Sequence, residues 1–368
     1  MYSINNPNIV HIMLTMIERE VAWQKKKLLS LSERKYAIFA AGNYAKTFYT
    51  HLKNDLDTDI EFFIDNNPRL SDQIINGKPI MYKPWDKISD FSEKYLVLIS
   101  TSANNFNQIS NELDEIGTPY SSSDAYYVTC HWERIKTNVK NMADDVSKFS
   151  YLALIWYWLT YDDSIHYVVD NQYFAIPQFA SPFNEVICDV GAYVGDTIEE
   201  FISRSIGRCK IYAFEPSDNL RSAIKERIKR LSIEWNLSDD TIQLINACVG
   251  RENKTVRFAE LGKTSDMVID SEDAGVEKQL CSIDAFFADK EPPTFIKADI
   301  EGFETDLLIG ATETIRKTKP KLAICIYHNP YDTVYVPEYV HSIYPEYKIA
   351  VRNHIACRLL DTVCYCWT

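Results

Sequence analysis

One twelve-residue stretch, residues 186–197 with the sequence VICDVGAYVGDT, constrains the fold more than any other part of the chain. A short apolar, β-branched run ends at Asp189, Gly191 and Gly195 mark a loop, and an amphipathic helix begins at Asp196. Because the chain has only 11 glycines in 368 residues, two of them four residues apart after a strand indicate a specific turn. The pattern predicts a strand, a tight loop and a helix N-terminus, which is the entry to a nucleotide pocket in a doubly wound sheet.

A second predicted strand, residues 210–214, ends in Glu215 and Pro216, twenty residues beyond Gly195. An acid at this strand exit can accept hydrogen bonds from both ribose hydroxyls of an adenosine. The spacing therefore predicts a ligand that contains adenosine.

The charges around the glycine loop favour one such ligand. Asp189 and Asp196 bracket the loop, and two carboxylates there would repel the pyrophosphate of a dinucleotide. They suit a ligand with positive charge, such as the sulfonium and amino groups of S-adenosylmethionine (SAM). We therefore expect SAM rather than NAD, with the following cofactor-binding residues: Asp189, Gly191, Ala192, Tyr193, Gly195, Asp196, Thr197, Glu215, Pro216, Asn246 and Ala247.

Strands alternate with helices through the C-terminal half. The last two predicted strands are separated only by residues 353–360, which is too short for a parallel crossover and predicts an antiparallel hairpin. Together the strands match the seven-stranded sheet of class I methyltransferases. They are predicted at 185–190, 210–215, 241–247, 294–299, 321–327, 346–352 and 361–367, with an additional pair at 254–260 and 279–283.

The N-terminal part predicts a smaller Rossmann-like α/β domain. After a helix within residues 1–30, strands are expected at 36–41, 60–64 and 95–100, and helices at 44–56 and 105–116. We place this domain at 1–125, a helical connector at 126–183 and the methyltransferase domain at 184–368. The turn AAGNYA at 40–45 is a degraded G-x-G-x-x-G, in which alanines restrict the backbone and the room for phosphate. Asp65 would be its ribose acid, but a degenerate scaffold or partner-binding module is the favoured interpretation.

Residues 140–368 resemble the FkbM-type SAM-dependent methyltransferases. The resemblance implies a class I fold and methyl transfer, usually to a hydroxyl of a sugar or natural product. VRNH at 351–354 matches the family's closing pattern only loosely, so we assign it no role. The motifs that carry the resemblance are DVGAYVGDT (189–197), YAFEPS (212–217), NACVG (246–250), SID (282–284), IKADIEGFE (296–304) and IYH (326–328), with MADDVSK (142–148) and QYF (172–174) upstream.

Asp299, Glu301 and His328 are the candidate catalytic residues because they follow neighbouring predicted strands. Methyl transfer requires alignment of the nucleophile and removal of its proton. The ordinary pKa of histidine suits His328 to general base catalysis. A metal site built from these three residues is an alternative for catechol-like substrates, but we assign no metal. Glu304 is expected as the third residue of a helix whose dipole it complements, and Lys297 as a partner of Asp299.

Composition limits the partners and the compartment. A net charge of −13 argues against nucleic acid or an anionic membrane as the main partner. Nine scattered cysteines without zinc or CxxC spacing indicate free thiols in a reducing compartment. No secretory signal is evident at the N-terminus, and the hydrophobic run at 151–161 is shorter than the roughly 20 residues of a membrane span. We expect a cytoplasmic protein, with this aromatic run as a core helix or the face of a homodimer.

The sequence thus predicts a SAM-dependent methyltransferase that methylates a hydroxyl of a small-molecule or glycan acceptor. The acceptor would be a sugar, a polysaccharide precursor or a secondary metabolite. Two alternatives stay open. One is a nucleotide-sugar or NAD(P)-dependent enzyme that works through the N-terminal unit, and the other is a non-catalytic SAM-binding module.

Overall fold

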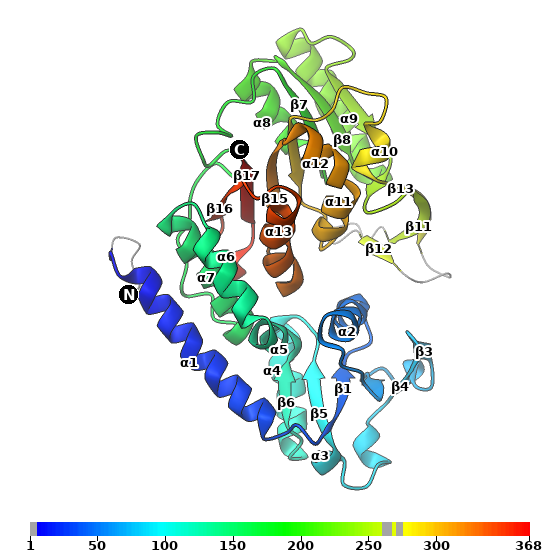
Figure 1. Ribbon diagram of the computed structural model, residues 1–368. Coiled ribbons are helices and arrows are strands. Elements are labelled where there is room, and N and C mark those ends of the chain that lie inside the picture. The colour runs from blue at the N-terminus through cyan, green and yellow to red at the C-terminus, as the bar shows by residue number, and fades with distance from the viewer. Residues whose placement is uncertain (1–5, 260–266, 270–274) are drawn as a thin grey trace. The chain divides into compact units, whose positions relative to one another are not determined.

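The computed structural model describes residues 6–259, 267–269 and 275–368 (Figure 1). It divides into two compact units, which are described separately. The first comprises Met1–Lys136 and Ile155–Asp162, and the second comprises Thr137–Leu154 and Asp163–Thr368. Helices α6 (Trp132–Asn141) and α7 (Asp145–Thr160) contribute residues to both units.

The first unit contains a six-stranded sheet in the order β3-β4-β2-β1-β5-β6. Neighbouring strands are parallel except β3 and β4, which are antiparallel. All five residues of β5 are buried, as expected for a central parallel strand that is covered on both faces. The strands are β1 (Lys35–Phe39), β2 (Phe62–Ile64), β3 (Ile74–Ile75), β4 (Lys78–Met81), β5 (Tyr95–Ile99) and β6 (Tyr120–Ser122).

The helices of the first unit confirm the predicted α/β alternation. The predicted helices at 44–56 and 105–116 correspond to α2 and α4, within two residues at each end. The sequence did not predict β3, β4 and β6, which have only two to four residues each. The helices are α1 (Ile9–Leu29), α2 (Asn43–Leu56), α3 (Phe91–Lys94), α4 (Ala103–Glu115) and α5 (Ser123–Cys130), with the 3-10 turns η1 (Pro68–Leu70) and η2 (Pro84–Asp86).

The second unit is built on a seven-stranded sheet in the order β16-β17-β15-β14-β7-β8-β9. Strands β15, β14, β7, β8 and β9 are parallel, and β17 runs antiparallel between β15 and β16. The predicted sheet and its terminal antiparallel hairpin are therefore confirmed. The strands are β7 (Glu185–Val190), β8 (Cys209–Phe214), β9 (Ile242–Ile245), β14 (Phe295–Ala298), β15 (Lys321–Cys325), β16 (Lys348–Asn353) and β17 (Thr362–Trp367).

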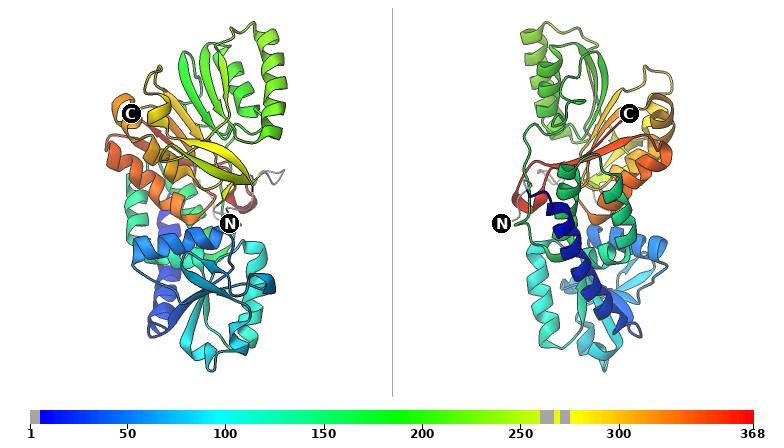
Figure 2. Two further views of the ribbon diagram at one scale, coloured as in Figure 1. Left: turned by 90° about the vertical axis from the view of Figure 1, so that its right-hand side faces the viewer. Right: turned by 60° about the vertical axis from the view of Figure 1, so that its left-hand side comes forward.

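Helices cover both faces of this sheet. Figure 2 shows α8 and α9, in green, on one face and α11, α12 and α13, in orange, on the other. Apolar residues of α8 and α9 pack with inward residues of the sheet in one core cluster that includes Ile198, Phe201, Ile224 and Phe295. The helices are α8 (Asp196–Ser205), α9 (Asp218–Trp235), α10 (Ile283–Phe286), α11 (Glu304–Gly310), α12 (Thr312–Thr318) and α13 (Pro330–Ile343), with the 3-10 turn η3 (Cys357–Leu359).

A small second sheet adjoins β9 in the sequence, in the order β10-β13-β11-β12. The predicted additional strand pair is confirmed, because β11 and β13 pair antiparallel. These strands are β10 (Cys248–Val249), β11 (Lys254–Ala259), β12 (Met267–Ile269) and β13 (Val276–Cys281).

Within the part of the chain that the structure describes, the helices are too short or too polar to cross a membrane.

Candidate active site

The glycine loop after β7 packs tightly against the segment that follows β14. Gly191 has a φ of +76°, and a Cβ atom built on it would lie 1.9 Å from the carbonyl oxygen of Asp299. Gly195 has a φ of +81° and is the N-cap of α8. A side chain at Gly191 would therefore separate two strand exits that form one site.

Glu215 is held in a fixed direction at the exit of β8. Its Oε2 accepts a hydrogen bond from the backbone N–H of Tyr193 at 3.0 Å, and its Oε1 accepts one from Ser217 at 2.9 Å. The side chain is buried. The acid predicted from the sequence thus lies directly beside the glycine loop.

Asp189 forms a fully buried ion pair behind the loop. Its Oδ1 lies 3.2 Å from Nζ of Lys297, which also donates hydrogen bonds to the carbonyl oxygens of Gly191 at 2.6 Å and Val190 at 3.3 Å. Burial raises the pKa of Asp189, although Lys297 opposes this rise. The sequence suggested that Lys297 pairs with Asp299, but its ion pair here is with Asp189. Lys297 therefore connects the carboxylate of Asp189 to the backbone carbonyl oxygens at the start of the glycine loop, which holds the loop in place.

A cavity of about 360 Å³ opens at the carboxyl ends of the parallel strands. Several predicted cofactor residues line it, whereas Asp189, Ala192, Gly195 and Asn246 lie outside its lining. Catalytic candidates Asp299 and Glu301 also line it, and His328 lies behind them. The lining comprises Gln172, Tyr173, Val190, Gly191, Tyr193, Asp196, Thr197, Phe214, Glu215, Pro216, Leu220, Ala247, Cys248, Val249, Phe258, Lys297, Asp299, Ile300, Glu301, Phe303, Tyr327 and Asp361.

The cavity is acidic, and the sheet order separates its two ends. Ala247, Val249 and Phe258 make an apolar end beyond β8 and β9, whereas the exits of β14 and β15 make a polar end. Among the described residues of the lining, Lys297 is the only lysine or arginine, and it already pairs with Asp189. Such a cavity favours a cation over an anion. The carboxylates of the lining are Asp196, Glu215, Asp299, Glu301 and Asp361.

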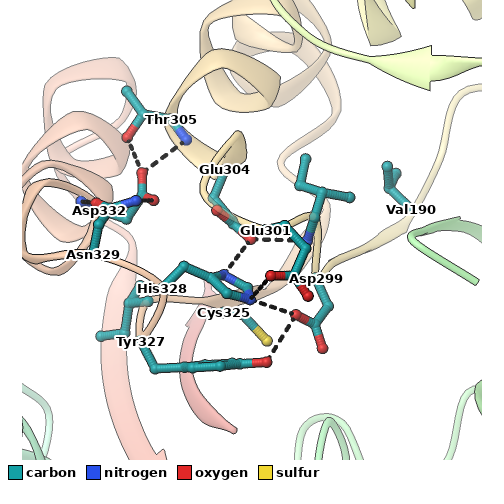
Figure 3. Close-up of polar contacts among 12 residues, drawn as sticks. Val190, Asp299, Glu301, Glu304, Thr305, Cys325, Tyr327, His328, Asn329 and Asp332 are labelled. Carbon is teal, nitrogen blue, oxygen red and sulfur yellow. Dashed lines mark hydrogen bonds and ion pairs between the residues drawn. The ribbon is translucent and has the colours of Figure 1, made fainter. Parts of the chain in front are cut away.

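His328 lies between carboxylates at the polar end (Figure 3). Its Nδ1 is 3.0 Å from Oε1 of Glu304, and its Nε2 is 3.4 Å from Oδ1 of Asp299 and 3.9 Å from Oε2 of Glu301. Burial alone would lower the pKa of His328, but these carboxylates, Glu304 first, raise it to about 10. The ordinary pKa expected from the sequence is therefore wrong, and His328 is an imidazolium at neutral pH when the cavity holds no other cation.

Asp299 is oriented by two tyrosines that the sequence analysis did not assign. Tyr173 donates a hydrogen bond to its Oδ2 at 2.9 Å, and Tyr327 donates one to its Oδ1 at 3.3 Å. Burial would raise the pKa of Asp299, but His328, Lys297 and the Tyr173 hydroxyl together lower it. The QYF motif at 172–174 was the available signal for Tyr173. Asp299 is therefore an ionised carboxylate that faces the cavity.

Glu304 begins α11 instead of being the third residue of a helix. Its side chain is fully buried, and Oε1 accepts a hydrogen bond from the backbone N–H of Ile300 at 2.9 Å. Buried Asp332 fixes the start of the same helix. Its Oδ1 accepts a hydrogen bond from the hydroxyl of Thr305 at 2.6 Å and another from the backbone N–H of Thr305 at 3.2 Å. Glu304 therefore does more than complement a helix dipole, since it holds His328.

Ligand atoms of Asp299, Glu304 and His328 lie within 4.8 Å of one another, close enough to consider a metal ion. However, the imidazole lies between the carboxylates, with Glu304 at one ring nitrogen and Asp299 at the other. Only an imidazolium supplies a donor at both nitrogens. The geometry is that of a chain of ion pairs, and we assign no metal ligands to it.

In the first unit, Asp65 follows β2 beside the degraded glycine turn. Its Oδ2 accepts a hydrogen bond from the backbone N–H of Ala41 at 3.1 Å, and its Oδ1 accepts one from Asn67 at 2.8 Å. Ala40 keeps a positive φ of 98° in this turn. The acid and the loop are thus arranged like Glu215 and its loop, and the role of this unit stays a prediction.

The chain is similar to one protein-family model and to several solved structures. The family model described as the methyltransferase FkbM domain matches residues 189–347. Among solved structures, methyltransferase FkbM from Methylobacillus flagellatus KT has a TM-score of 0.58 and 17% sequence identity, covering 97% of this chain and 100% of that one. The SAH-bound methyltransferase PaMTH1 from Podospora anserina has a TM-score of 0.33 and 11% identity, covering 73% and 97%. No curated protein matches the chain.

The likeness to the Methylobacillus flagellatus structure is one of fold. The predicted fold class, an α/β protein with a class I methyltransferase sheet, is confirmed.

Proposed function

We propose that the chain transfers the methyl group of SAM to a hydroxyl, because residues 189–347 match the family model of the methyltransferase FkbM domain. The acceptor we propose is a sugar, a polysaccharide precursor or a secondary metabolite. The observation that carries the proposal is the acidic cavity at the strand exits, with Glu215 beside the glycine loop and Asp299 at the polar end.

The residues of the cavity fit SAM. Gly191 has no room for a side chain between the loop and Asp299, so the backbone itself lines the cavity there. Glu215 would accept from the ribose hydroxyls, and the apolar end formed by Ala247, Val249 and Phe258 would hold the adenine. The surplus of carboxylates would attract the positive charges of the ligand. When bound, SAM supplies a methyl carbon already activated by its sulfonium.

The chain's own residues then align the acceptor and remove its proton. Asp299 faces the cavity as a carboxylate, and the hydroxyls of Tyr173 and Tyr327 fix its direction. A carboxylate so placed can accept the proton of an acceptor hydroxyl. Glu301, which also lines the cavity, lies within 3.9 Å of His328 and would bind another polar group of the acceptor.

The test is calorimetric titration of the full-length protein with SAM and S-adenosylhomocysteine (SAH), for the wild type and for Glu215→Gln. The amide of the variant would place an N–H₂ group against backbone donors and lose an acceptor, so we expect at least tenfold weaker binding of both ligands. Glu313→Gln, on the exposed surface of α12, is the matched control and should bind like the wild type.

A panel of hydroxylated acceptors with radiolabelled SAM then tests transfer. Binding without transfer to any acceptor supports the non-catalytic SAM-binding module instead. Absence of SAM binding by the wild type overturns the proposal and turns attention to nucleotide-sugars or NAD(P) at Asp65.

A further inference from the structure

At the polar end of the cavity, the imidazole of His328 lies among several carboxylates. Glu304 faces Nδ1 of His328, while Asp299 and Glu301 face Nε2. The side chain of His328 is only 8% exposed, so water screens these interactions weakly. Burial, and next the carboxylate of Glu304, raise the pKa of Asp332 on α13 well above its ordinary value, so Asp332 does not add a full negative charge at His328.

The remaining charged neighbours do not change the sign of this potential. Asp361, on the connection from β16 to β17, interacts electrostatically with both His328 and Asp299. Lys297 on β14 acts on Asp299, but it is itself paired with Asp189. His328 is therefore a cation that Asp299, Glu301 and Glu304 share at this end.

Asp299 connects His328 to the cavity. It lines the cavity, whereas His328 does not, and its Oδ1 is 3.4 Å from Nε2 of His328. A positive charge placed in the cavity beside Asp299 would compensate the same carboxylate that His328 compensates now. Two like charges that share one partner oppose each other, so the imidazolium becomes easier to deprotonate.

We propose that a bound sulfonium discharges His328, whose proton leaves to the solvent, and so converts it into the base that receives the acceptor's proton through Asp299. This inference rests on the proposed function. It assigns Glu304 as a positioning residue, because Glu304 holds Nδ1 of the ring while Nε2 faces Asp299.

The step balances in atoms and charge. Asp299 takes the proton as the O–H bond of the acceptor breaks, and it passes that proton to Nε2 of His328. Meanwhile the bond from the acceptor oxygen to the methyl carbon forms, and the S–C bond breaks with its electron pair going to sulfur. One positive charge disappears at sulfur and one appears on His328. The net charge of this buried site is therefore the same before and after the transfer. A preorganised site of low dielectric favours such a step, because its dipoles do not have to reorganise during the reaction.

The test is an NMR titration of His328 in the full-length protein labelled with ¹³C-histidine. The chain has 7 histidines, and His328→Gln identifies the resonance. The ligand-free pKa should be about 10, and SAH, whose sulfur is neutral, should leave it nearly unchanged. SAM should lower it by about three units, to near neutral pH, where a general base is effective. At pH 8.5 this changes His328 from almost fully charged to almost uncharged.

The outcomes separate the inference from the function on which it rests. If SAM and SAH both bind and leave His328 with the same pKa, the discharge of His328 is overturned. If neither ligand binds in calorimetry, the proposed function fails first. Because SAM and SAH are compared on the wild-type protein, this test does not require any variant to fold.

Glu304→Gln gives the second readout. It removes the carboxylate at Nδ1 and should lower the ligand-free pKa of His328 by more than one unit. Glu304→Asp, which keeps the charge, should restore most of the shift. An unchanged pKa in Glu304→Gln would contradict the positioning role, because a merely structural residue would not move it.

Discussion

Oε1 of Glu304 lies 3.0 Å from Nδ1 of His328, and the two side chains are 0% and 8% exposed. The pair joins the first residue of α11 to the segment after β15, so it links two neighbouring strand exits. Because Asp299 occupies the other ring nitrogen, the arrangement fixes the charge as well as the orientation of the ring.

The first expectation concerns stability against pH. The pKa of His328 is raised from 6.5 to about 10 in the folded protein, so folding is favoured by proton binding. This contribution is complete below the unfolded pKa and is lost as the pH rises through the folded value. Between pH 6.5 and 10, the free energy of unfolding should therefore fall by up to about 1.4 kcal/mol per pH unit. Urea unfolding of the wild type and His328→Gln measures the difference, and the variant should show the flatter dependence.

Equal pH dependence of the two proteins across this window would show that His328 is not charged in the native state. His341→Gln is a suitable control, because His341 lies on α13 and contacts the carbonyl oxygen of Tyr347 rather than this cluster.

The second expectation concerns Gly191→Ala. The added Cβ would meet the carbonyl oxygen of Asp299 at 1.9 Å on a backbone with positive φ. The loop or the segment after β14 must move, which we expect to destabilise the protein by about 2–4 kcal/mol. SAM binding should weaken at least a hundredfold. Gly42→Ala is the control, since its Cβ would have open space, and it should cost less than about 1 kcal/mol. Thermal unfolding and calorimetry measure both, and a well-folded Gly191→Ala that binds SAM would contradict the packing.

Much of this fold could be predicted because the sequence carries strong local signals. The seven strands of the large sheet alternate with helices, and the short connection before β17 excludes a parallel crossover. Glu215 could be placed beside the glycine loop because parallel neighbours bring their carboxyl ends to one edge.

The ion-pair pattern could not be predicted in the same way. The sequence placed Lys297 on the face of Asp299, but alternation along one strand does not show which neighbouring strand supplies the partner. Lys297 pairs across to Asp189 on β7 instead. Similarly, Tyr173 lies 126 residues from Asp299 in the chain, and no local pattern reports such a contact. The pKa of His328 depends on Glu304 from another element, so its residue type alone was misleading.

The third expectation concerns Tyr173→Phe. The variant keeps the ring but removes the hydroxyl that donates to Oδ2 of Asp299, so the pKa of Asp299 should rise and its direction should loosen. We expect methyl transfer to the acceptor found in the panel to slow about tenfold, with SAM affinity within threefold of the wild type. Tyr151→Phe, which removes a buried hydroxyl bonded to the carbonyl of Thr333, is the matched control and should leave the rate unchanged. Equal rates for Tyr173→Phe and the wild type would remove Tyr173 from the site.

The last expectation concerns the buried pair of Asp189 and Lys297. Lys297→Met would leave the carboxylate of Asp189 without its cation in a site that is 0% exposed, and we expect a loss of about 3–5 kcal/mol in the free energy of unfolding. Lys297→Met combined with Asp189→Asn removes both charges, so most of that loss should be recovered. Urea unfolding of the two single variants and the double variant gives their coupling energy. A coupling energy near zero would mean that the two groups are stabilised separately, and the loop carbonyls of Val190 and Gly191 would then be the main partners of Lys297.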